Sequence, residues 1–75
     1  MGRGMQLDKD DIDAILCDVG FRQDMFSVWT KGQTRVHVTN HCVWVIAGFE
    51  SLFMSMWPVD SGEFMEALAR AELKG

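Results

Sequence analysis

The amino-acid sequence predicts an α+β domain, α-β-β-β-β-α, in which a four-stranded antiparallel meander sheet has two helices packed on one face. Capped helical patterns stand at both ends of the chain, and a segment rich in Val, Trp, Phe and Thr lies between them. The 75 residues are enough for one hydrophobic core. We therefore treat residues 1–75 as a single domain, with residues 1–6 as a flexible N-terminal lead-in.

The first predicted helix spans residues 9–19 and has both a start and a stop signal. Asp8 stands at the N-cap position and Asp11 at the third helical position, where each side chain can accept a hydrogen bond from the other's backbone. Gly20 follows the last apolar residue of the pattern and suits the left-handed position that ends a helix.

The second predicted helix spans residues 61–73 and begins with the same kind of signal. Asp60 stands at its N-cap position and Glu63 at its third helical position. Its apolar stripe is thin, because two of its four members are alanines: Phe64, Ala67, Leu68 and Ala71.

Between the helices, β-branched and aromatic residues predict four strands: Phe26–Thr30, Thr34–Thr39, Cys42–Ala47 and Leu52–Trp57. The breaks contain turn-forming residues such as Gly32, Asn40 and Gly48. Pro58 ends the last strand because proline has no amide hydrogen for a ladder.

The predicted register places only apolar side chains on one face of this sheet. We expect a three-residue turn after Thr30, a two-residue turn after Thr39 and a four-residue turn after Ala47. The resulting face carries Phe26, Val28, Val36, Val38, Val43, Val45, Ala47, Leu52, Met54 and Met56. Both helices are expected to cover it.

The opposite face then holds all three tryptophans and is expected to be uncovered. Its candidate partner-binding residues are Trp29, Arg35, His37, Trp44, Phe53 and Trp57. Trp and Arg are enriched among interface hot spots, and large exposed aromatic patches mark contact sites. Because a core of this size is marginal alone, we expect a homodimer or a tight contact with another protein through this face. Two alternatives remain open: the second helix covers the tryptophans, or association uses an exposed edge strand.

The chain is acidic, with eleven Asp and Glu against seven Lys and Arg and a net charge of -4. Nucleic acid is therefore not the expected main partner. A second candidate surface is an acidic patch that would dock on a basic partner protein, formed by Asp8, Asp10, Asp11 and Asp13. Helix capping and the helix dipole are the competing explanation for these acidic residues.

No motif points to catalysis or to metal binding. His37, His41 and Cys42 come nearest to a zinc ligand set, but His41 lies in a predicted turn while the other two share a strand face. A nucleophilic pair of Cys42 and His37 would lie diagonally across a hairpin, too far apart for a hydrogen bond. We predict no enzymatic activity, no metal ligand and no cofactor.

The chain is expected to be cytoplasmic and to make no membrane contact. The N-terminal segment lacks the apolar core of a signal peptide, and two cysteines are too few for a disulfide scaffold. The longest apolar stretch, Cys42–Phe49, is far shorter than the about 20 residues of a membrane span.

These observations predict a small acidic, non-enzymatic protein-interaction module that binds or occludes a partner protein through the aromatic sheet face and the acidic helix. In size and charge it resembles the interaction-only proteins that phages and mobile elements encode, such as anti-defence and anti-CRISPR inhibitors of host systems. The alternative function is a single-stranded nucleic-acid-binding aromatic sheet, on which unpaired bases would stack beside Arg35 and His37.

Overall fold

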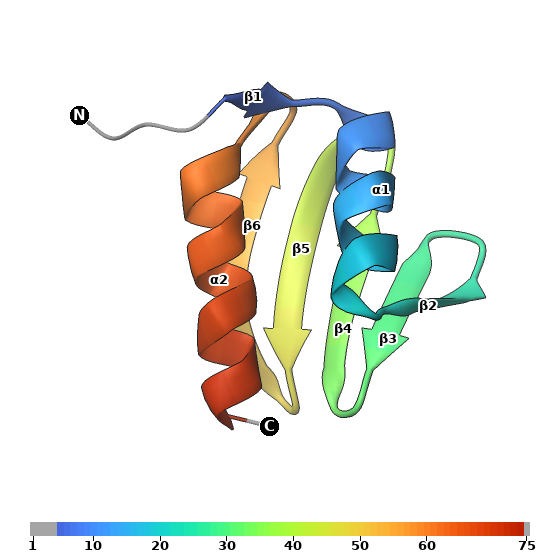
Figure 1. Ribbon diagram of the computed structural model, residues 1–75, viewed down its shortest axis with the longest axis vertical. Helices are drawn as coiled ribbons and strands as arrows, with labels where there is room; N and C mark the ends of the chain where they lie inside the picture. The colour runs from blue at the N-terminus through green and yellow to red at the C-terminus, as the bar shows by residue number, and fades with distance from the viewer. Residues whose placement is uncertain (1–4, 75) are drawn as a thin grey trace.

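The computed structural model describes residues 5–74 and has the predicted α+β class (Figure 1). The elements in chain order are β1 (Gln6–Leu7), α1 (Lys9–Val19), β2 (Arg22–Met25), β3 (Val28–Lys31), β4 (Thr34–Val38), β5 (Cys42–Ala47), β6 (Glu50–Met56), β7 (Val59–Asp60) and α2 (Ser61–Lys74). The main sheet is antiparallel with five strands rather than the predicted four, in the order β2-β3-β4-β5-β6. A separate two-stranded ladder joins β1 to β7.

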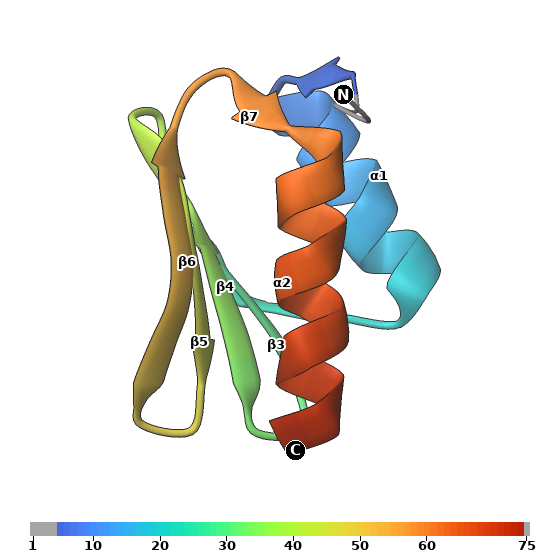
Figure 2. The same ribbon diagram turned by 90° about the vertical axis from the view of Figure 1, so that its left-hand side faces the viewer.

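Both helices cover the same face of the five-stranded sheet, as the sequence predicts (Figure 2). The hydrophobic core lies between this face and the helices. Its buried members are Leu7, Ile12, Leu16, Phe21, Val36, Val38, Val43, Val45, Ala47, Val59, Phe64, Ala67, Leu68 and Ala71. The domain therefore has two layers, and the other face of the sheet carries no helix (Figure 2).

The helix boundaries follow the local signals in the sequence. The backbone N–H of Asp11 donates to Asp8 Oδ1 at 3.0 Å, and that of Asp8 donates to Asp11 Oδ2 at 3.1 Å. Gly20 ends α1 with φ 108°, a left-handed conformation that glycine adopts without strain. The N–H of Glu63 donates to Asp60 Oδ2 at 3.0 Å at the start of α2. Caps depend on a few neighbouring residues, which is why sequence alone locates them.

The fifth strand was not predicted, because it lacks an apolar pattern. All side chains of β2 are exposed, so neither alternation nor hydrophobicity reveals it. The predicted strand Phe26–Thr30 is therefore wrong at its start: Phe26 and Ser27 form a turn, and β2 pairs with β3 across it. Phe26, expected on the core face, is 91% exposed in this turn.

The short ladder between β1 and β7 was also missed, since two-residue strands are too short to show a period. Gln6 lies opposite Asp60, and Leu7 lies opposite Val59. The N–H of Ser61 also donates to the carbonyl of Met5 at 2.8 Å. Residues 5 and 6 of the expected lead-in are thus joined to the segment before α2. Residues 1–4 of that lead-in lie outside the described residues.

The predicted register is confirmed for the central hairpin and wrong for its two neighbours. In the central hairpin Val36 lies opposite Val45 and Val38 opposite Val43, as expected. Between β3 and β4 the turn has two residues rather than three, and Trp29 instead of Val28 lies opposite Val36. The reason is Gly32 at the first turn position, whose φ of 61° suits a two-residue hairpin turn.

The hairpin of β5 and β6 also has a two-residue turn in place of the predicted four, with Ala47 opposite Glu50. Gly48, with φ 63°, takes its first position. An irregularity in the pairing at Val45 and Ile46 then sets the rest of β6, so that Phe53 lies opposite Val45.

Shifts in register exchange the two faces of a strand, because side chains alternate. Trp29, Phe53 and Trp57 consequently pack against the core instead of lying on the uncovered face. Met54 and Met56, expected in the core, are 63% and 70% exposed.

Candidate functional site

The helix-free face of the five-stranded sheet is the candidate functional site, and we call it the outer face (Figure 2). The pairing of β3 to β6 assigns its residues, since partners across a ladder share a face. They are Val28, Thr30, Arg35, His37, Cys42, Trp44, Ile46, Ser51, Met54 and Met56.

A row of four side chains crosses this face from β3 to β6. Val28 lies opposite His37, His37 opposite Trp44, and Trp44 opposite Met54. Directly opposed residues in antiparallel strands bring their side chains into contact distance. The row therefore forms a continuous strip with the indole near its centre and a thioether at the β6 edge.

Trp44 is held in place on both sides although it is 39% exposed. Its Nε1 donates to Ser51 Oγ at 2.6 Å, and its ring lies 5.8 Å from that of His37 at an interplanar angle of 43°. A fixed aromatic side chain loses little conformational entropy when a partner covers it. The structure thus presents a large, partly apolar ring in one orientation.

The structure divides the six candidate partner-binding residues into two groups. Arg35, His37 and Trp44 lie on the outer face, as expected. The other three lie on the core side and pack against its cluster: Trp29, Phe53 and Trp57.

The side chains of Phe53 and Trp57, in this second group, already contact other residues of the same chain. The ring of Phe53 lies 6.4 Å from that of Phe64, and Trp57 Nε1 donates to the carbonyl of Thr39 at 2.8 Å. The homodimer interface that sequence reasoning expected therefore cannot use all six residues on one surface.

The two exposed methionines of β6 are members of the outer face that sequence reasoning missed. Met54 lies opposite Trp44 and Met56 opposite Cys42. Methionine is flexible and polarisable, and such side chains adapt to irregular partner surfaces. Their face is set by the irregularity in the pairing at Val45 and Ile46, because the two-residue turn at Gly48 alone would place Met54 opposite Val43 on the core side. No signal in the sequence marks this irregularity.

The acidic patch lies at the start of α1, in the helical layer rather than on the outer face (Figure 2). Asp8 and Asp11 are engaged in the reciprocal cap, and Asp13 is half-buried. Asp10 is exposed. Helix capping therefore accounts for two of the four carboxylates, and the two candidate surfaces face different sides of the molecule.

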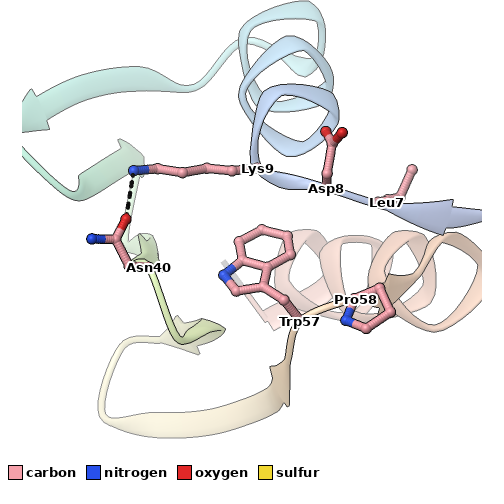
Figure 3. Close-up of a pocket in the computed structure, with 6 residues that line it drawn as sticks. All are labelled: Leu7, Asp8, Lys9, Asn40, Trp57 and Pro58. Carbon is pink, nitrogen blue, oxygen red and sulfur yellow. Dashed lines mark hydrogen bonds between the residues drawn. The ribbon is translucent and has the colours of Figure 1, made fainter.

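A pocket of about 460 Å³ opens where the start of α1 meets the β4–β5 turn and the β6–β7 connection (Figure 3). Lys9 reaches across to Asn40, its Nζ donating to Oδ1 at 3.4 Å, with the indole of Trp57 beside them. The described lining residues offer no pairing of a nucleophile with a base: Leu7, Asp8, Lys9, Asn40, Trp57 and Pro58.

A second pocket, of about 510 Å³, lies at the other end of the sheet beside the ion pair of Lys31 and Glu72. Lys31 Nζ is 2.9 Å from Glu72 Oε2 and also donates to the carbonyl of Val19 at 3.1 Å. This lysine ties β3 to both helices, which gives it a structural role.

Within residues 5–74, no three His, Cys, Asp or Glu side chains gather to hold a metal ion. Neither helix of this part of the chain is long and apolar enough to cross a membrane. No protein-family model, curated protein or solved structure matches the sequence.

Proposed function

We propose that the protein is a non-enzymatic protein-interaction module that binds a partner protein through the outer face of its sheet. The observation that carries the proposal is the fixed, partly exposed Trp44 at the centre of a face that no helix covers. Tryptophan is a frequent interface hot spot, and methionine, here the exposed Met54 and Met56, is enriched at interfaces. Binding would occlude the partner's surface, which is how an inhibitor of a host system of the kind that phages encode would act.

The charge of the outer face indicates the chemistry of the partner. The residues assigned to it on β3 to β6 include the guanidinium of Arg35 and no Asp or Glu, although the whole chain has a net charge of -4. Arg35 is exposed on the strand next to Trp44. A partner that places an apolar side chain against the indole and a carboxylate beside Arg35 would be bound in one orientation.

Trp44→Ala should abolish capture of the partner while leaving the fold intact, because the indole projects from the sheet away from the core. The measurement is affinity capture from the native host lysate with wild-type and variant protein side by side. Phe49→Ala is the matched control, since Phe49 is a fully exposed aromatic in the β5–β6 turn, outside the outer face. Equal capture by wild type and Trp44→Ala would contradict the proposal.

Binding of single-stranded nucleic acid is the competing function, and the face offers little support for it. Stacking platforms present several exposed aromatics in a basic groove. Here Trp29 and Trp57 pack toward the core, which leaves Trp44 and His37 as the aromatic rings of the outer face.

A fluorescence titration with single-stranded oligonucleotides at two salt concentrations separates these functions. We expect the tryptophan emission to stay unchanged at both, because an acidic chain repels phosphates. Tight quenching that weakens at the higher salt concentration would instead establish nucleic-acid binding and contradict the protein-interaction proposal.

A further inference from the structure

The two edges of the five-stranded sheet differ in how they are protected. β2 is short, carries Arg22 and Asp24, and has a register shift between Gln23 and Met25. Charges and bulges of this kind keep an edge from pairing with another strand. β6 has seven residues, and from Ser51 to Met56 it contains neither a charged residue nor a proline. β6 has a register shift of its own between Ser51 and Phe53, so the unguarded part of this edge is the stretch from Phe53 to Met56.

The backbone of β6 presents polar groups to the outside of the sheet. The N–H of Trp57 donates to the carbonyl of His41, the residue before β5, at 3.3 Å. Because pairing groups alternate along an antiparallel strand, Ser55 and Phe53 also face β5, while the N–H groups of Met54 and Met56 face away. Figure 2 looks onto this edge, and no described helix or strand stands in front of it.

Helix α2 lies beside the same edge, and the side of the helix that faces the edge carries acidic and basic residues at different heights. Arg70 Nη2 donates to the carbonyl of Leu52 in β6 at 3.2 Å, so this side of α2 faces the edge. Glu63 and Glu66 precede Arg70 by seven and four residues, which places them on the same side of the helix. All three side chains are exposed. The acidic groups thus lie toward the start of the helix and the basic group toward its end.

We infer that a second copy of this chain docks on the β6 edge, antiparallel and related by a two-fold axis, so that two five-stranded sheets join into one. In this arrangement Glu66 of one copy lies near Arg70 of the other, whereas a parallel arrangement would bring like charges together. The uncharged β6 segments meet without repulsion, and a two-fold axis closes the assembly at two copies.

This inference goes beyond the proposed function and does not depend on it. Joining two β6 strands would place two outer faces side by side, with Met54 of each copy near the junction. A partner with two matching sites would then bind both at once and with higher avidity. A partner with one site would bind either copy equally well.

Charge reversal on α2 tests the arrangement, with association measured by sedimentation velocity from low to high micromolar protein. Wild type should shift toward the dimer as concentration rises. Glu66→Arg and Arg70→Glu should each weaken association by roughly tenfold or more, because each opposes like charges across the axis. The double variant should recover association, since the opposite charges are then exchanged. Failure of the double variant to recover would overturn the predicted contact between α2 helices.

Amide hydrogen exchange of the wild-type protein tests the strand pairing without any substitution. The N–H groups of Met54 and Met56 should exchange quickly in dilute protein and become protected as concentration rises. A protein that stays monomeric at every concentration, or a dimer in which both amides exchange quickly, would overturn the inference.

Trp44→Ala distinguishes this inference from the proposed function. It should leave self-association unchanged and remove partner capture, whereas Glu66→Arg should do the reverse. Loss of the dimer on Trp44→Ala would instead assign self-association to the outer face and overturn the edge arrangement.

Discussion

Val45→Asp should leave the protein without a cooperative thermal unfolding transition. Val45 is completely buried in β5, opposite Val36 on one side and Phe53 on the other. A carboxylate there would have no cationic partner, and burying an unpaired charge costs more than a small domain can tolerate. Since domains have only about 5–15 kcal/mol of stability, the folded state should be lost. Circular dichroism against temperature measures this directly.

Met54→Asp is the matched control for this substitution. Met54 is in the neighbouring strand, but its side chain is on the outer face and 63% exposed. An exposed carboxylate stays hydrated, so this variant should unfold cooperatively near the wild-type temperature. If Val45→Asp folded and Met54→Asp did not, the assignment of the two faces would be wrong.

Phe64→Ala should lower the free energy of unfolding by about 3–5 kcal/mol, the usual cost of truncating a buried phenylalanine. Phe64 is fully buried at the start of α2, and its ring lies 6.4 Å from that of Phe53 in β6. The rest of the buried stripe of α2 includes Ala67 and Ala71, which contribute little area. Phe64 and Leu68 therefore supply much of the contact between this helix and the sheet.

Urea denaturation followed by circular dichroism measures the effect of Phe64→Ala. Met65→Ala, at the next position but 44% exposed, should change the midpoint far less. Comparable losses in the two variants would show that α2 packs on the sheet through a different side.

The helices could be predicted from sequence because their boundaries depend on neighbouring residues. Asp8 and Gly20 fix the limits of α1 through hydrogen bonds and backbone conformation that involve a few positions only. The sheet depends instead on turn length, and an error of one residue reverses a face. The sequence of β6 does not reveal which of its side chains face the core. Leu52, Phe53 and Met54 are consecutive apolar residues, so either alternation of buried and exposed positions fits them.

The face on which a candidate residue lies could be predicted from sequence only in the hairpin whose strand register was predicted correctly. Arg35, His37 and Trp44 belong to the central hairpin, whose turn was assigned correctly, and they lie on the expected face. Trp29 and Phe53 belong to the outer hairpins, where the Gly32 turn and the irregularity at Val45 and Ile46, respectively, shift the side-chain alternation by one residue. Exposure of an aromatic residue is set by this long-range register and not by its own neighbours in sequence.

The ladder between β1 and β7 pairs two segments that are far apart in the chain, and each of them directly precedes a helix. The hairpins of the main sheet close short loops, whereas this ladder forms only when residues 6 and 60 meet. Contacts that form after the rate-limiting step of folding mainly slow the reverse reaction. Because it closes so long a loop, we expect the ladder to form late in folding, so that its loss should mainly shorten the lifetime of the folded state.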